Sequence, residues 1–322
     1  MSRAGKRLTK TLTLRIASVV LILLVISFLS FSLLYLAPGD LVKNLLGNRP
    51  STSEAIEAIR TQYHLDDPFL VRYFDWLFSA LRGDFGVSIR LQQPVTTVIE
   101  SRVGVTAELI GFSFLLALVT AVPLGILSAA RAGKRLDRAA SAVSLFGLSA
   151  PSFALAILAI SVFSLLLPIF PAYGAGAEGV ERFWHLVLPS AVLAAGIGAI
   201  LMRMTRAAVL RELESDAITF ARSRGITESK IQRIALRGAL IPIVTSAGLI
   251  LTFIIGGTII VETVFALPGL GQLLEEAVLF KDLPVVQAIT LLVAAAIAII
   301  TILVDISYTL LDPRVRAREL VG

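Results

Sequence analysis

Residues able to carry covalent or metal chemistry are scarce in this chain of 322 residues. It contains no cysteine and only two histidines, His64 and His185, which lie far apart in the sequence. Without cysteine there are no disulfides, thiol nucleophiles or thiolate ligands, and two distant histidines do not predict a metal centre. The hydrolase motifs H-E-x-x-H and G-x-S-x-G are also absent. The sequence therefore offers no catalytic set.

The chain also lacks the loop with which many ATPases hold a phosphate. The motif G-x-x-x-x-G-K-[ST] does not occur, and Gly133-Lys134-Arg135 has neither its spacing nor its hydroxyl. We therefore expect this chain to bind no cofactor and not to hydrolyse ATP by itself.

The composition is that of a membrane protein. Hydrophobic residues make up 56% of the chain and charged residues 16%, whereas soluble domains have roughly 45–50% and about 25%. The core of a soluble protein of this length cannot bury such an excess of apolar side chains. The composition therefore argues strongly against a soluble enzyme.

Six uncharged segments are each long enough to cross a bilayer as a helix. A span needs about 20 mainly apolar residues, and its backbone must satisfy its own hydrogen bonds in lipid. The first segment is too long for the apolar part of a signal peptide, so we expect it to be retained. The predicted fold is all-α and polytopic, with transmembrane helices at Ile16–Leu36, Leu109–Ala130, Ala139–Pro168, Phe183–Met202, Gly238–Val261 and Leu283–Val304.

The distribution of basic residues predicts the orientation. Of the 29 lysines and arginines, 20 lie before the first segment, after the second, after the fourth and after the sixth. Such residues are enriched in cytoplasmic loops, so both termini are expected in the cytoplasm. Because they are spread over short loops, the net charge of +6 does not predict nucleic-acid binding. The predicted regions are a cytoplasmic N-terminus at 1–15, a first helix at 16–36, an extracytoplasmic region at 37–102, a five-helix domain at 103–310 with a cytoplasmic loop at 203–237, and a cytoplasmic C-terminus at 311–322.

The external region carries two predicted helices. Ser51 and Glu54 fit a capping box, which predicts a short helix running to Tyr63. Phe69–Leu81 is rich in aromatic residues, a composition that predicts a helix along the membrane interface. This second helix is either a docking surface for an extracytoplasmic partner or an anchor that seals the bundle, and both interpretations stay open.

The loop 203–237 has the spacing of two helices separated by a turn. Leucine, isoleucine and alanine recur every three or four residues from Leu210 to Ala221, which predicts a helix. Gly225 ends this pattern, and Ile226–Leu236 predicts a second helix. On composition alone the loop is either a solvated connector or a rigid projection below the membrane.

The string DAITFARSRG in this loop resembles the EAA loop of bacterial binding-protein-dependent ABC importer permeases. In the dipeptide, oligopeptide and nickel branch the loop reads close to D-Y-V-R-T-A-R-A-K-G. Four positions match, namely Asp216, Ala221, Arg222 and Gly225, and three depart, namely Ala217, Thr219 and Phe220. The resemblance implies that this helix inserts into a groove of a cytoplasmic ATPase. A small residue at 221 would permit close approach, and Gly225 would supply the positive φ that ends the helix.

Other strings resemble the same family in the same order along nearly all of residues 10–316. They are LAPGD at 36–40, RGDFGVSI at 82–89, LFGLSAPSF at 145–153, HLVLPS at 185–190, GTIIVETVFALPGLGQ at 257–272 and LLDPRVR at 310–316. The resemblance implies a permease of the type I importer class with a cytoplasmic coupling helix, located in the bacterial inner membrane. The implied partners are a homologous second permease subunit, two cytoplasmic ATP-binding subunits that use ATP and Mg, an extracytoplasmic solute-binding protein and membrane lipid.

The implied cargo is a di- or oligopeptide, with nickel chelates, glutathione or another small solute as the alternative. A secondary carrier is the rival from another class, although no acidic cluster lies at mid-membrane as a proton-coupled carrier would need. A membrane enzyme is a third possibility, against which the missing catalytic motifs argue.

Several residues are candidates for a gate or a transport pathway. Pro151 predicts a kink in the third segment, serving either gating or packing. Glu262 lies at the edge of the hydrocarbon and either lines the pathway or anchors the next turn. Pro268, Gly269 and Gly271 are interpreted as an external turn of an outer gate. The remaining candidates are small polar residues, for which helix packing is the safer interpretation: Ser144, Ser149, Thr245, Ser246, Thr252 and Thr258.

Overall fold

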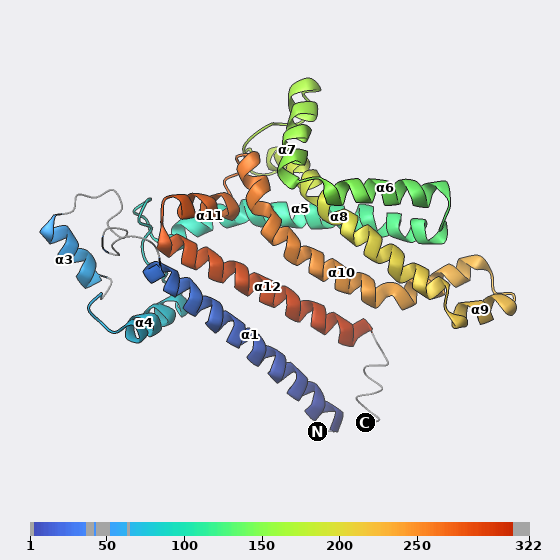
Figure 1. Cartoon of the computed structure of the whole chain (residues 1–322), viewed down its shortest axis with the longest axis horizontal. Coiled ribbons are helices and arrows are strands. Elements are labelled where there is room, and N and C mark those ends of the chain that lie inside the picture. Colours follow the sequence, from blue (N-terminus) through green and yellow to red (C-terminus); the bar gives the residue numbers. More distant parts are fainter. Residues whose placement is uncertain (1–2, 37–41, 43–51, 63–64, 312–322) are drawn as a thin grey trace. The chain divides into compact units, whose positions relative to one another are not determined.

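The computed structural model describes residues 3–36, 42, 52–62 and 65–311, and most of them are helical (Figure 1). The chain divides into two compact units. One unit is built mainly on Thr106–Leu267, and the other on the described parts of Gly5–Val105 together with Pro268–Ala298. Helices α5 (Val95–Ala130) and α12 (Leu283–Leu311) each continue from one unit into the other.

Five of the six uncharged segments each lie within a single helix, and the third is divided between two helical parts. Among the described residues, α5, α8 (Val180–Leu213), α10 (Glu228–Val264) and α12 are long and apolar enough to cross a membrane. The third segment makes a fifth span if α6 (Arg135–Ser149) is taken together with α7 (Ser152–Ile160) and the π-helix η1 (Ser161–Leu166). The first segment lies in α1 (Arg3–Leu36), whose described apolar stretch is Ala17–Ser32.

The third segment is broken rather than kinked at Pro151. Helix α6 ends at Ser149, α7 begins at Ser152, and the two parts are bent by 103°. Ala150 and Pro151 are both extended. For Ala150 this is expected, because a proline disfavours helical geometry in the residue before it. The Ser149 hydroxyl donates to the carbonyl of Leu145 at 2.9 Å, not to the Gly147 carbonyl that proline cannot serve.

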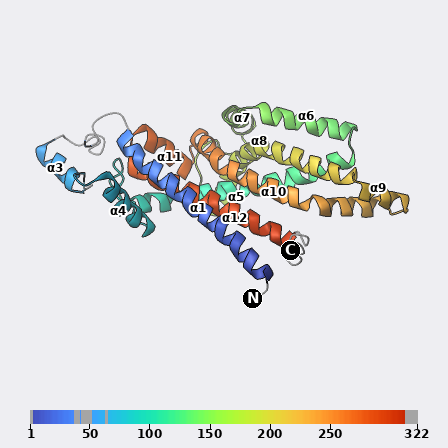
Figure 2. The ribbon, with the colours of Figure 1, turned by 60° about the horizontal axis from the view of Figure 1, so that its bottom comes forward.

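In the unit built on Thr106–Leu267, α8 is the central helix. It packs against α6 and α10, and both views place it beside these two helices (Figures 1 and 2). Glycines allow α5 and α6 to approach the backbone of α8 closely. A Cβ at Gly125 of α5 would lie 2.7 Å from the Met202 carbonyl, and a Cβ at Gly147 of α6 would lie 3.2 Å from the Ala195 carbonyl. More than a dozen side chains of α8 are buried, as expected for a helix that has neighbours on several sides.

The other unit contains α1, α3 (Ser53–Gln62), α4 (Phe69–Leu81), the start of α5, α11 (Leu270–Leu279) and the first part of α12. Its core joins three helices through the buried residues Val95, Val98 and Ile99, Leu270, Leu273 and Ala277, and Val285, Ala288 and Ile289. The bounds of α4 match the prediction. Ser51, His64, and most of the LAPGD and LLDPRVR strings lie outside the described residues.

Helix α11 was not predicted. The proline- and glycine-containing string at 268–271 indicated only a turn, but the positive φ of this connection lies at Ala266, at 47°. Gly269 is extended and precedes the first turn of α11, and Gly271 is buried inside that helix. The glycines therefore start a helix instead of forming the turn itself.

Candidate functional site

Helix α9 (Asp216–Ser223) forms the tip between the ends of α8 and α10 (Figure 1). The predicted single helix through Leu210 and Ala221 is in fact two, because the chain is extended at Ser215. The Ser215 hydroxyl donates to the Glu212 carbonyl at 2.7 Å, which closes α8. The Ser215 carbonyl accepts the N–H groups of Ile218 and Thr219, which opens α9.

Gly225 ends α9 as predicted. Its φ is +74°, its N–H donates to the Arg222 carbonyl at 2.9 Å, and the N–H of Ile226 donates to the Ala221 carbonyl at 3.2 Å. This pair of bonds is a Schellman motif, which favours glycine because the residue must be left-handed. Thr227 is then extended, and α10 begins at Glu228. The predicted sequence of short helix, glycine turn and second helix is therefore confirmed.

One face of α9 packs against its own chain. Ile218 is buried in a cluster with Leu213 of α8 and with Ile231 and Ala235 of α10. Ala221 is buried as well, and its small size permits close packing within the chain. The opposite face presents Phe220, which is 60% exposed. Phe220 is one of the positions that depart from the family pattern.

Charged groups surround this exposed phenylalanine. The guanidinium of Arg224 lies 4.6 Å from the centre of the Phe220 ring. Arg222 pairs with Glu228 at 2.9 Å, and this bond lowers the pKa of the Glu228 carboxyl. Both side chains are exposed, so the pair contributes little stability and mainly orients the groups. Asp216 is exposed at the first position of α9. The result is an apolar side chain within a charged rim.

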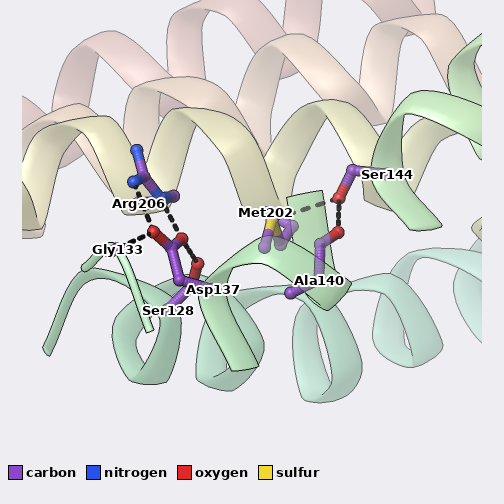
Figure 3. Close-up of polar contacts among 7 residues, drawn as sticks. All are labelled: Ser128, Gly133, Asp137, Ala140, Ser144, Met202 and Arg206. Atoms are coloured by element: carbon purple, nitrogen blue, oxygen red, sulfur yellow. Dashed lines mark hydrogen bonds and ion pairs between the residues drawn. The ribbon is translucent and has the colours of Figure 1, made fainter. Parts of the chain in front are cut away.

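A buried ionic cluster joins α8 to α6 about two turns before the end of α8. Asp137 of α6 accepts hydrogen bonds from Arg206 of α8, at 2.6 Å from Nε and 2.8 Å from Nη2, and also from the Ser128 hydroxyl and the Gly133 N–H (Figure 3). Asp137 lies two residues before the third uncharged segment, which begins at Ala139. The hydrogen bonds from Arg206 hold the pKa of the Asp137 carboxyl well below its usual range. We refer to these four residues as the Asp137 cluster.

The sequence interpretation missed the Asp137 cluster, because its members are separated by up to 78 positions, from Ser128 to Arg206. One signal was available: Asp137 is the only acid among four basic residues in its connection. Ser144, a pathway candidate on α6, donates to the Ala140 carbonyl at 2.8 Å and contacts the Met202 sulfur at 3.2 Å (Figure 3).

A second buried carboxylate was also missed. Asp282, which is 2% exposed, accepts bonds from the Ser88 hydroxyl and from the N–H groups of Ile89 and Arg90. The Arg90 side chain pairs with Glu276 at 2.6 Å. The string RGDFGVSI therefore forms a loop that is held against the segment between α11 and α12.

The hydroxyl candidates on α10 do not line one face. Thr245 and Thr252 are seven residues apart and partly exposed, whereas Ser246 and Thr258 are buried on other sides. Each hydroxyl donates to a carbonyl of its own helix three or four residues earlier. These bonds satisfy the hydroxyls locally, so a role in packing is sufficient to explain them.

Glu262 is fully buried and accepts a hydrogen bond from the Thr106 hydroxyl of α5 at 2.7 Å. Its backbone carbonyl accepts the Leu267 N–H at 2.8 Å, which helps to close the turn after α10. These contacts favour the anchoring interpretation over a lining one. Pro268 is exposed, and Gly269 and Gly271 are buried.

Among the described residues, no group of three or more histidine, cysteine, aspartate or glutamate side chains is placed to hold a metal ion. The His185 side chain makes a hydrogen bond with the backbone, since its Nδ1 lies 2.8 Å from the Gly174 carbonyl oxygen. Within the described part of the chain, the exposed aromatic side chain of α9 and the buried carboxylates Asp137, Asp282 and Glu262 are the main features of the candidate sites.

Comparison with known proteins gives consistent matches along the chain. Residues 121–317 match the family described as binding-protein-dependent transport system inner membrane component, and residues 8–110 match the N-terminal region of such components. A Brucella abortus (strain 2308) protein named as a peptide transport system permease is 37% identical over 313 residues, covering 96% of this chain and 99% of that protein.

The glutathione transport system permease protein GsiC of Escherichia coli (strain K12) is 35% identical over 303 residues, covering 94% of this chain and 97% of that protein. Among solved structures, a chain of the inward-facing MetNI methionine ABC transporter matches with a TM-score of 0.56. It is 22% identical and covers 67% of this chain and 96% of that chain, a likeness that concerns the fold.

Proposed function

The chain belongs to the family of binding-protein-dependent transport system inner membrane components, and we propose that it works as half of the pathway of an ATP-driven importer for di- or oligopeptides. It is a multi-pass membrane permease subunit. In our proposal a homologous second permease provides the other half, and two cytoplasmic ATP-binding subunits and an extracytoplasmic solute-binding protein complete the complex. ATP and Mg are used by the ATP-binding subunits.

The observation that carries this proposal is the exposed face of α9. Phe220 is more than half exposed at the tip of two long membrane-crossing helices, within a rim of charged groups. An exposed aromatic ring surrounded by polar residues is typical of the centre of a protein interface. The chain has no phosphate-binding loop of its own, so energy must enter through a partner, and α9 is the site that we assign to it.

The same geometry supports a mechanism. Ile218 of α9 is buried in one cluster with Leu213 of α8 and Ile231 of α10, so a movement of α9 would be passed to the ends of these helices. Closure of two ATP-binding subunits around ATP would therefore rotate α8 and α10, and the pathway would switch between inward- and outward-facing states.

Peptide is the proposed cargo because relatives of near full length carry peptide in their names. Glutathione, itself a small peptide, is the cargo in the name of another relative of similar identity. A peptide cargo and a glutathione cargo therefore belong to the same class of substrate, small peptides. Nickel chelates remain the alternative from outside that class.

The substrate proposal is tested by the ATPase activity of the assembled complex in lipid vesicles. We expect solute-binding protein loaded with a dipeptide to raise the rate of ATP hydrolysis above that with ligand-free binding protein. Glutathione and a nickel–histidine chelate serve as competing ligands. Stimulation by nickel chelate alone, or none by any ligand, would contradict the peptide assignment.

We further propose that α9 and both termini lie on the cytoplasmic side, as the basic residues indicate. The absence of cysteine makes a labelling test clean. A cysteine at Ser223 should react with a membrane-impermeant maleimide only after the cells are permeabilised, whereas one at Gln93 should react in intact spheroplasts. The reverse pattern would defeat the topology.

A further inference from the structure

Helix α4 lies against the middle of the first predicted membrane span, which is part of α1. The hydroxyl of Tyr73 shares a hydrogen bond with that of Ser27 at 2.8 Å and lies 3.4 Å from the Leu24 carbonyl of α1. Tyr73 is 5% exposed and Ser27 is 2% exposed, so this contact excludes solvent. Figure 1 shows α4 beside the C-terminal half of α1.

The position of Ser27 in α1 sets the depth of this contact. Ser27 lies about midway between Arg15 and Asp40, the charged residues that flank the first uncharged segment. It is nine residues before the end of α1 at Leu36, which corresponds to roughly 14 Å of helix. The hydrocarbon layer is about 30 Å thick. The Tyr73 hydroxyl therefore reaches close to the middle of the bilayer.

Aromatic contacts hold the whole inner face of α4 at this level. The rings of Phe69, Tyr73 and Trp76 each pack against Phe31 of α1, with centroids 5.4–5.7 Å apart. Phe31 is five residues before the end of α1, or roughly 8 Å of helix. Contacts both at Ser27 and at Phe31 are incompatible with a helix that rests above the headgroups.

The opposite face of α4 is apolar and uncovered. Five side chains between 46% and 75% exposed lie on it: Leu70, Val71, Phe74, Phe78 and Leu81. A third, narrow strip holds the polar residues Arg72, Asp75 and Ser79, which are three and four positions apart. An interfacial helix has a wide polar face, whereas here two of the three faces are apolar.

We propose that α4 is sunk into one leaflet of the bilayer beside α1, with the face from Leu70 to Leu81 in contact with lipid acyl chains and the polar strip turned toward the headgroups. The depth follows from the first span alone; that the leaflet is the outer one rests on the proposed orientation. Phe28 of α1, which is 40% exposed, packs against Phe69 and Tyr73, so the exposed apolar side chains of α1 and α4 adjoin, and we assign lipid as the occupant of both. Helix α4 is then no docking surface for a soluble partner.

The test measures collisions of a nitroxide label with two quenchers in the assembled complex, reconstituted in vesicles. Labels are attached in detergent at single cysteines replacing Phe74, Phe78 and, as a third position on the same face, Leu70. Oxygen concentrates in acyl chains, whereas a water-soluble nickel chelate is excluded from them. We expect oxygen collisions to exceed nickel collisions at all three positions.

Two controls belong to the same experiment. A label at Gln93, in the exposed loop before α5, should show the reverse ratio, and one at Asp75 on the polar strip should fall between. Nickel collisions at 74 and 78 equal to those at 93 would overturn the proposal. So would a fall in both collision rates at 74 and 78 on adding the solute-binding protein, because a protein would then cover this face. The measurement needs no transport, so its failure is separate from a failure of the importer assignment.

Discussion

Replacing Asp137 with alanine is expected to be the most destabilising single change in the described part of the chain. The variant leaves the guanidinium of Arg206 beside two helices without the carboxylate that accepts its two hydrogen bonds. Breaking such a buried pair costs about 3–5 kcal/mol. The Arg206 side chain is 28% exposed, so we expect the free energy of unfolding to fall by an amount near the lower end of this range, about 3 kcal/mol.

The measurement is the temperature at which the detergent-purified chain loses its monodisperse elution. A loss of about 3 kcal/mol corresponds to a drop on the order of 6–12 °C for a chain segment of 150–250 residues. Arg138→Ala, at the exposed neighbouring position of α6, is the matched control and should change this temperature little. Adding Arg206→Met to Asp137→Ala should recover part of the loss. An unchanged temperature for Asp137→Ala would show that the cluster does not hold α6 to α8.

Replacing Phe220 with aspartate is expected to separate this chain from its ATP-binding subunits without unfolding it. The ring faces away from the buried side of α9 and is 60% exposed, so the native fold does not depend on it. Losing an aromatic side chain at the centre of an interface costs at least about 2 kcal/mol, or roughly thirtyfold in affinity. Co-purification of the ATP-binding subunits on the tagged chain measures this effect.

Thr219→Asp is the control for the added charge, since Thr219 is the exposed neighbour of Phe220 on α9. It should leave co-purification nearly intact, and both variants should elute like the wild type when purified alone. If Phe220→Asp retained its partners as well as Thr219→Asp does, the exposed face of α9 would not be the docking site. Phe220→Leu should retain most of the binding, because the contact is apolar.

The features that the sequence predicted are those carried by local patterns. The uncharged segments, the bounds of α4 and the turn at Gly225 follow from apolar runs, periodicity and glycine, all of which act within a few residues. The break at Ser215 was missed for a physical reason. Leu213 and Ala217 stay four residues apart across it, so the periodicity continues although the helix does not.

The features that were missed depend on partners distant in sequence. Asp137 is buried because Arg206, 69 positions later, neutralises it, and Asp282 is buried because the loop at Ser88 supplies its donors. Neither acid lies in a recognisable motif. Ala221 was correctly placed on α9, yet which side of α9 packs inward is decided by α8 and α10. The exposed apolar residue of α9 is Phe220, which departs from the family pattern, and the sequence did not indicate this.

ATP-driven uptake in reconstituted vesicles is the most direct test of the role proposed for this chain. Vesicles containing both permeases and the ATP-binding subunits, with ATP on the side of α9 and peptide-loaded binding protein on the other, should accumulate labelled dipeptide. Accumulation should stop without ATP or without the ATP-binding subunits, and Phe220→Asp should abolish it while Thr219→Asp does not. Uptake by vesicles that contain only the permease, without ATP, would contradict the importer account and establish a secondary carrier instead.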